Sequence, residues 1–355
     1  MADDRETTMR YRIAVTADIT PPYFRKLCEL GDVEVCGWVS TGVLMSEEEQ
    51  IERLRNFPVY VVGYERVSER VVAGLPELRL VACARANPVN IECAALSKRG
   101  IPLIYAPGRN AVSAAEFTLG MMLSEARHIA RSHNALKNGR YLGAPSANIL
   151  ETPKRDDVVW NLSGDSPYKL FHGFELSGKT LSLLGLGHIG RMVAHYAKAF
   201  DMRILSYDPY VDQGEAAALG VTLVDLPTLY READFLSIHC KESPETRAMV
   251  DANAFALMKR TAILVNAGRA SIVDQKSLLD ALREKRIAGA ALDVYWEEPL
   301  PSNHPLLTLD NVTITPHLAG ASYEVPDRQS RMVVEDVERW IRGMQPRNVW
   351  NREVL

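Results

Sequence analysis

Short apolar runs alternate with helical patterns along most of the chain, in two series. The runs of the first series are rich in β-branched residues and span residues 11–17, 33–39, 59–63, 78–84 and 101–106. Those of the second series span residues 180–185, 202–207, 221–224, 235–240, 262–266, 289–294 and 312–315. Such runs, with helix-like segments between them, are typical of buried parallel strands in βαβ units. The sequence therefore predicts an α/β protein with two doubly wound parallel-sheet domains.

Three segments stand apart from this alternation. Residues 111–137 predict one long helix, in which Ser113 and Glu116 have the spacing of a capping box. Residues 140–172 are rich in Pro, Gly, Ser and Asn, and a structureless loop of that length is uncommon inside a compact domain. The sequence thus predicts a surface arm or a functional insertion there. Residues 328–344 predict an amphipathic terminal helix.

Composition excludes several classes of protein. The 355 residues exceed one typical domain of about 100–200 residues, and 47% apolar with 24% charged residues is ordinary for a soluble globular protein. The formal charge is −4, with no basic stripe, so nucleic acid is not an expected partner. No apolar stretch approaches the roughly 20 residues of a membrane helix. The odd count of 5 cysteines, without a CxxC pair, argues against disulfides and metal, and favours the reducing cytoplasm.

A glycine-rich turn follows the first run of the second series. Gly185 would permit a tight turn, Gly187 would let the backbone approach a pyrophosphate, and Gly190 would let the following helix pack closely on the strand. Free N–H groups at the start of that helix, where His188 and Ile189 stand, would face the phosphates. These residues are therefore predicted to bind a dinucleotide.

An acidic residue extends this prediction. Asp208 ends the next predicted strand, about 20 residues after the glycines. Its carboxylate would accept hydrogen bonds from ribose hydroxyls and repel a 2′-phosphate, which favours NAD over NADP. The alternative is a plain tight turn with an Asp at a strand end.

Several ordered motifs carry a resemblance to a known family. The chain contains GLGHIG at 185–190, NAGRA at 266–270, ALDVYWEEP at 291–299, TPHLAG at 315–320 and PRNVWN at 346–351. From about residue 75 to 351 it resembles the D-isomer-specific 2-hydroxyacid dehydrogenases.

The resemblance implies an architecture. Two α/β domains would flank a cleft, with a Rossmann nucleotide domain (109–320) inserted into a flavodoxin-like substrate domain (1–108 plus 321–355). It also implies a homodimer whose interface includes the long helix. The insertion at 140–172, with Trp160, Tyr168 and Phe171, would then either extend that interface or form a surface loop.

Hydride transfer to a 2-keto acid needs a cation for the carboxylate and ketone, and a proton donor for the ketone oxygen. Arg269 follows a predicted strand, and the resemblance makes it the catalytic and substrate-binding arginine; taken alone it would be a surface arginine in a salt bridge. His317 follows the last predicted strand and would donate or accept the proton. Glu298 matches the carboxylate partner of the histidine in the family, and its spacing favours it over Glu297.

The resemblance assigns further contacts. Asp293 would contact the nicotinamide carboxamide, or would only cap a strand end. His239 would lie along the cofactor. Together with His317, the remaining residues predicted to bind the cofactor are Ala267, Gly268 and Gly320.

The substrate loop of the family corresponds to residues 80–92, whose tip is Arg85, Ala86 and Asn87. Its backbone amides would bind the substrate carboxylate. Three positions depart from the family pattern: Ala86 and Ala270 stand where glycine is usual, and Lys241 stands where proline is usual. The lysine would either bind an extra anionic group or point to water.

The sequence thus predicts a cytoplasmic NAD-dependent oxidoreductase that interconverts a D-2-hydroxy acid and its 2-keto acid. One alternative is an NADH-sensing binding protein of the same fold, which would not need a proton donor beside the nicotinamide. Another is a formate or phosphite dehydrogenase. A formate enzyme is expected to carry Gln as the partner of the histidine, where this chain has Glu298.

Overall fold

The structure is a computed structural model that describes residues 10–142 and 166–355. The chain divides into two compact units. Unit 1 comprises Met1–Asn110 and Ala321–Leu355, and unit 2 comprises Ala111–Gly320. Each unit is built on a parallel sheet, so the predicted fold class is confirmed. Within the described ranges, no helix is long and apolar enough to cross a membrane.

Unit 1 contains a 5-stranded parallel sheet in the order β2-β1-β3-β4-β5, which is the flavodoxin-like order. Its strands are β1 (Tyr11–Val15), β2 (Gly31–Val35), β3 (Val59–Val62), β4 (Leu80–Cys83) and β5 (Leu103–Ile104). Every residue of β3 and β4 is buried, because a parallel strand covered on both faces must be apolar throughout. The helices of the first segment are α1 (Pro21–Leu30), α2 (Trp38–Thr41), α3 (Glu47–Leu54), α4 (Glu69–Gly74) and α5 (Cys93–Lys98).

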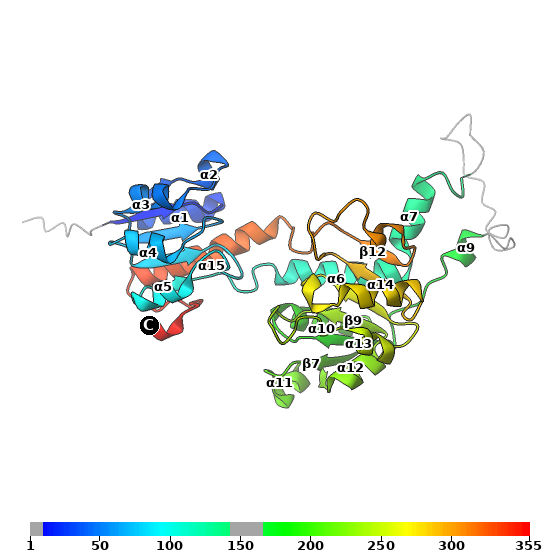
Figure 1. Cartoon of the computed structure of the whole chain (residues 1–355). Coiled ribbons are helices and arrows are strands. Elements are labelled where there is room, and N and C mark those ends of the chain that lie inside the picture. Colours follow the sequence, from blue (N-terminus) through cyan, green and yellow to red (C-terminus); the bar gives the residue numbers. More distant parts are fainter. Residues whose placement is uncertain (1–9, 143–165) are drawn as a thin grey trace, which may run out of the picture. The chain divides into compact units, whose positions relative to one another are not determined.

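The carboxyl-terminal segment completes unit 1. The predicted terminal helix is α15 (Glu324–Ile341), which packs on α1 and contributes Val333, Val334 and Val337 to the core beside the sheet. In Figure 1 this orange-to-red helix lies with the blue and cyan elements from the start of the chain. The short helix η3 (Arg352–Val354) ends the unit.

Unit 2 contains a 7-stranded parallel sheet in the order β12-β11-β10-β9-β6-β7-β8, which is the Rossmann order with one added strand. Its strands are β6 (Thr180–Leu184), β7 (Arg203–Tyr207), β8 (Thr222–Leu223), β9 (Phe235–Ile238), β10 (Ile263–Asn266), β11 (Gly289–Leu292) and β12 (Val312–Ile314). Its later helices are α10 (His188–Lys198), α11 (Gln213–Ala218), α12 (Leu226–Glu232), α13 (Ala252–Leu257), η1 (Ala270–Ile272), α14 (Gln275–Arg283) and η2 (Pro305–Thr308). The strand order reverses between β6 and β9, and such a switch point is where open α/β sheets bind ligands.

The prediction of one helix over 111–137 is wrong. The structure has α6 (Ala111–Ala126) and α7 (Ile129–Lys137), separated at His128, whose φ is 52°. The break occurs because the Ala126 carbonyl accepts from Phe174 N at 3.0 Å rather than continuing the helical pattern. The capping box is also wrong: Ser113 lies inside α6, and its hydroxyl donates to Ala319 O at 2.9 Å.

Most of the 140–172 segment, including Trp160, lies outside the described residues. Its last part contains α9 (Pro167–Leu170). The Phe171 ring meets Tyr141 edge-on, with ring centroids 5.9 Å apart. The two alternatives for this segment, a dimer arm and a surface loop, stay open.

Candidate active site

The glycine turn joins β6 to α10, and each glycine has a distinct environment. Gly185 has φ +101°, and a Cβ there would lie 2.6 Å from Cys240 N. A Cβ on Gly190 would lie 2.4 Å from Gly185 O, so only glycine lets helix and turn approach this closely. Gly187, by contrast, borders open space. Since no side chain caps α10 there, the first N–H groups of the helix have no side-chain acceptor, as is typical of helix starts that bind phosphate groups.

Two side chains border this turn from neighbouring strands. Asp208, at the end of β7, accepts from Leu186 N at 2.8 Å and from Tyr210 N at 3.0 Å, so its carboxylate is fixed against the turn. His239 follows β9 and bonds Ser237 Oγ through Nε2 at 2.8 Å. Burial lowers the pKa of His239 to about 4, so the ring is neutral at physiological pH. An uncharged ring and a positioned carboxylate are compatible with a dinucleotide beside them.

The segment NAGRA forms a turn after β10 that is shaped by its first residue. Asn266 accepts from Gly268 N at 3.0 Å and donates to Arg269 O at 3.0 Å, so one amide side chain closes the turn. Ala267 and Gly268 lie within it. Arg269 is exposed and donates to Gly268 O at 2.7 Å. The sequence motif contains Asn266, but its role in closing the turn was not predicted. The tendency of Asn side chains to bond the backbone two residues further on could have indicated that role.

Glu298 and His317 form a direct pair. His317 Nδ1 lies 2.7 Å from Glu298 Oε2, while Glu298 Oε1 accepts from Tyr295 N at 3.0 Å. Partial burial raises the pKa of Glu298, but the hydrogen bonds from His317 and Tyr295 and the charge of Arg269 outweigh it and hold that pKa below its usual range. An ionised carboxylate only accepts hydrogen bonds, so Nδ1 carries a proton and Nε2 is left available.

Two of the three predicted catalytic side chains, Glu298 and His317, are thus in direct contact. The charge of Arg269 also lowers the pKa of Glu298, as the smallest of the effects on that group. The pair also borders a pocket of about 540 Å³, whose other walls include Tyr295, Leu300 and Ile314.

Asp293 holds the loop that carries His317. This carboxylate is fully buried and accepts from Leu318 N and Ala319 N, each at 2.8 Å, and from Thr315 Oγ1 at 2.6 Å. His317 itself has φ +56°, which is uncommon for a residue other than glycine. The hydrogen bonds of Asp293 thus fix an unusual backbone conformation. Its predicted contact with the nicotinamide carboxamide remains a prediction, as does the cofactor contact of Gly320.

The predicted substrate loop lies in unit 1, after β4. Among the described residues, no hydrogen bond is donated by the backbone N–H groups of Ala86 and Asn87. The loop is held by Asn90, whose amide donates to Gly63 O and Glu65 O at 3.3 and 2.7 Å. Free backbone donors at the carboxyl end of a parallel strand suit an anionic ligand. Lys241, another departure from the family pattern, is an exposed residue of unit 2.

No cluster of His, Cys, Asp or Glu with metal-binding geometry is present in residues 10–142 and 166–355. The five cysteines are free thiols. Burial raises the pKa of Cys240, next to the glycine turn, to about 11. This thiol is therefore protonated at neutral pH.

The Rossmann strand order, the glycine turn at its switch point and the Glu298–His317 pair define a dinucleotide-binding oxidoreductase. Residues 119–319, more than half of the chain, match the model of the D-isomer specific 2-hydroxyacid dehydrogenase, NAD binding domain. The chain belongs to the D-isomer-specific 2-hydroxyacid dehydrogenase family, as the sequence motifs predict.

Individual relatives cover most of the chain. It is 34% identical to the glyoxylate reductase of Korarchaeum cryptofilum, over 98% of each protein. It is 36% identical to the D-3-phosphoglycerate dehydrogenase of Methanocaldococcus jannaschii over 96% of this chain, which spans only 59% of the length of that relative. The fold is shared with the NADPH-dependent glyoxylate/hydroxypyruvate reductase of Sinorhizobium meliloti, with TM-score 0.75 and 24% identity over 96% of this chain and 97% of that one.

Proposed function

We propose that this chain interconverts a D-2-hydroxy acid and its 2-keto acid, with NAD(H) as the cofactor and His317 as the proton donor and acceptor. The single observation that supports this most is the 2.7 Å contact between His317 Nδ1 and Glu298 Oε2. It orients the imidazole and leaves Nε2 available to a substrate oxygen. A protein that only senses NADH has no need of such a pair.

Each residue has a defined task in this proposal. The bound nicotinamide supplies or accepts the hydride. Arg269 binds the carboxylate and polarises the ketone, because a guanidinium presents parallel N–H donors to an oxyanion. Glu298 stabilises the imidazolium form of His317 before the proton is given to the ketone oxygen. The amides of residues 85–87 hold the carboxylate of the substrate.

The preference for NAD is supported by Asp208. Its carboxylate is fixed by Leu186 N and Tyr210 N beside the glycine turn, where a second negative charge on the ribose would be repelled. The proposal also includes a homodimer in the cytoplasm. These two parts rest on the family resemblance and on the cysteine count.

The proposed function is tested with a panel of 2-keto acids offered with NADH and, separately, with NADPH. We expect turnover of at least one acid, formation of the D-product, and a kcat/KM at least about tenfold higher with NADH than with NADPH, since one adverse charge contact of 1.4 kcal/mol changes affinity tenfold. Absence of turnover with every acid would refute the enzyme assignment. A preference for NADPH would refute only the role of Asp208.

A further inference from the structure

Two arginines without carboxylate partners lie at the carboxyl end of the unit 1 sheet. Arg85 follows β4 and Arg109 follows β5, and neither forms an ion pair with a described residue. The two loops are joined, since Ala106 N donates to Arg85 O at 2.9 Å. Burial lowers the pKa of Arg109, and the charge of Arg85 also lowers it. Two neighbouring like charges are unfavourable unless an anion joins them.

The surrounding groups do not neutralise this pair. Beneath it lies Cys83, the last residue of β4, and burial raises the pKa of that thiol to about 12. Glu65, which follows the neighbouring strand β3, accepts from Trp38 N at 2.8 Å instead. On α15, Asp327 accepts from Thr20 Oγ1 at 3.0 Å. Neither carboxylate forms an ion pair with Arg85 or Arg109 in the described part of the chain.

Both guanidinium groups are nevertheless held in place. Arg85 lies over the ring of Tyr64, 5.3 Å from its centroid, and that ring meets Trp38 edge-on at 4.8 Å. Arg109 donates to the Gln329 side chain, and its Nε is buried without a hydrogen-bond partner in the described structure. Aromatic and amide contacts fix these cations without cancelling their charge.

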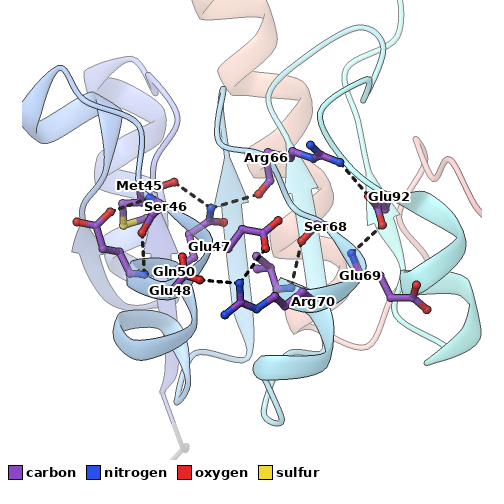
Figure 2. A network of polar contacts seen from close by, with 12 residues as sticks. Met45, Ser46, Glu47, Glu48, Gln50, Arg66, Ser68, Glu69, Arg70 and Glu92 are labelled. Carbon is purple, nitrogen blue, oxygen red and sulfur yellow. Dashed lines mark hydrogen bonds and ion pairs between the residues drawn. The ribbon is translucent and has the colours of Figure 1, made fainter.

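Neighbouring arginines of the same unit show the contrast. Figure 2 shows Arg66 directed at Glu92 and Arg70 directed at Glu48. The N–O distances are 3.4 and 2.5 Å. Both of these arginines have a side-chain exposure above 60%. Arg66 and Arg70 are thus exposed and paired, whereas Arg85 and Arg109 are half-buried and form no ion pair with a described residue.

We propose that Arg85 and Arg109 bind a second anionic group of the substrate, a phosphate ester or a second carboxylate, in addition to the carboxylate at C1. The inference rests on the proposed function, in which Arg269 and the amides of residues 85–87 take the C1 carboxylate. It defines the substrate class as 2-hydroxy acids with two anionic groups.

The kinetic test compares hydroxypyruvate, which has one anionic group, with its phosphate ester and with oxaloacetate, which have two. We expect the wild type to favour one doubly anionic acid by at least about tenfold in kcat/KM. Arg85→Gln and Arg109→Gln should lower kcat/KM for that acid about 10- to 100-fold, the range of a lost hydrogen bond to a charged group. The effect of Arg109→Gln on hydroxypyruvate should stay within about threefold.

The matched control is Arg70→Gln, which removes an exposed arginine of the same unit and should change neither value. Preference for the ester or for oxaloacetate identifies the anionic group. Equal losses on all three acids, no loss, or a wild-type preference for hydroxypyruvate would overturn the inference.

A binding measurement separates this inference from the proposed function. Inorganic phosphate should raise the melting temperature of the wild type and of Arg70→Gln more than that of Arg85→Gln or Arg109→Gln. If no 2-keto acid is turned over but this difference is found, the proposed function fails and the anion site stands. An identical response of all four proteins refutes the anion site.

Discussion

The polar groups at the carboxyl ends of the two sheets differ in whether they have partners within the protein. In unit 2, Asp293 uses its carboxylate on three donors of the loop after β12, and Glu298 accepts from His317 and Tyr295. In unit 1, Arg85 and Arg109 carry charges that no described carboxylate neutralises, and the amides of Ala86 and Asn87 donate to no described acceptor. Groups that satisfy one another fix a reactive side chain in place, whereas groups left unsatisfied are suited to bind a ligand.

The largest effect is expected from breaking the satisfied set in unit 2. Asp293→Ala leaves the donors Leu318 N, Ala319 N and Thr315 Oγ1 without their acceptor, at about 1–3 kcal/mol for each buried group. We expect a loss of about 3 kcal/mol or more in the free energy of unfolding of unit 2. Amide hydrogen exchange at Leu318 and Ala319 should accelerate accordingly.

Asp293→Asn serves as the conservative variant, because it keeps one acceptor oxygen. It should lower the free energy of unfolding less than Asp293→Ala does. Unchanged exchange at Leu318 and Ala319 in Asp293→Ala would show that the loop does not depend on this carboxylate.

A smaller effect is expected from the buried acid beside strand β12. Glu125 on α6 is 3% exposed and accepts from Thr313 Oγ1 at 2.6 Å. Burial raises the pKa of Glu125, so its stabilising contribution is complete below the unfolded pKa of about 4.3 and is lost as the pH rises through the folded pKa. Glu125→Gln should therefore melt at a higher temperature than the wild type at pH 8, and this difference should shrink towards pH 4.

The matched control for Glu125→Gln is Glu116→Gln, an exposed position on the same helix. It should leave the melting temperature unchanged at every pH. A Glu125→Gln difference that grew as the pH fell would contradict the assigned direction.

The smallest effect is expected in unit 1. Arg85→Gln removes one of two like charges and one contact with an aromatic ring, and these changes oppose each other. We expect the free energy of unfolding without added anion to change by no more than about 0.5 kcal/mol. A loss above about 1 kcal/mol in thermal melting would mean that Arg85 serves the fold, and the contrast between the two sheets would disappear.

The sequence predicted best those elements that are determined by neighbouring residues in the chain. Apolar runs between turn residues overlap every strand named above, and most closely the fully buried ones, because burial on both faces selects apolar residues. The run predicted at 33–39 is displaced: β2 ends at Val35, and Trp38 begins α2. The glycines at 185 and 190 were predicted correctly from backbone geometry alone. Strand β5 is shorter than its predicted run at 101–106, because Tyr105 N donates to Asn348 O from the far end of the chain.

Non-local partners account for what the sequence did not predict. Ser113 has the spacing of a helix cap. Its hydroxyl nevertheless donates a hydrogen bond to the carbonyl of Ala319, which is 206 positions away in the sequence. The sequence did not indicate a role for Arg109, because its partner Gln329 is 220 positions away along the chain. The motifs named His317 and Glu298, but only the coordinates give the donors that Asp293 holds around them.

The most direct test of the account is the proton donor itself. In His317→Asn the ring is removed, while Asn tolerates the positive φ of this position. We expect kcat/KM for a 2-keto acid with NADH to fall about 10²- to 10⁴-fold, the usual contribution of a general acid, while the Kd for NADH stays within about twofold. His195→Asn, at an exposed position of α10, should match the wild type. Turnover by His317→Asn within tenfold of the wild type would contradict the account.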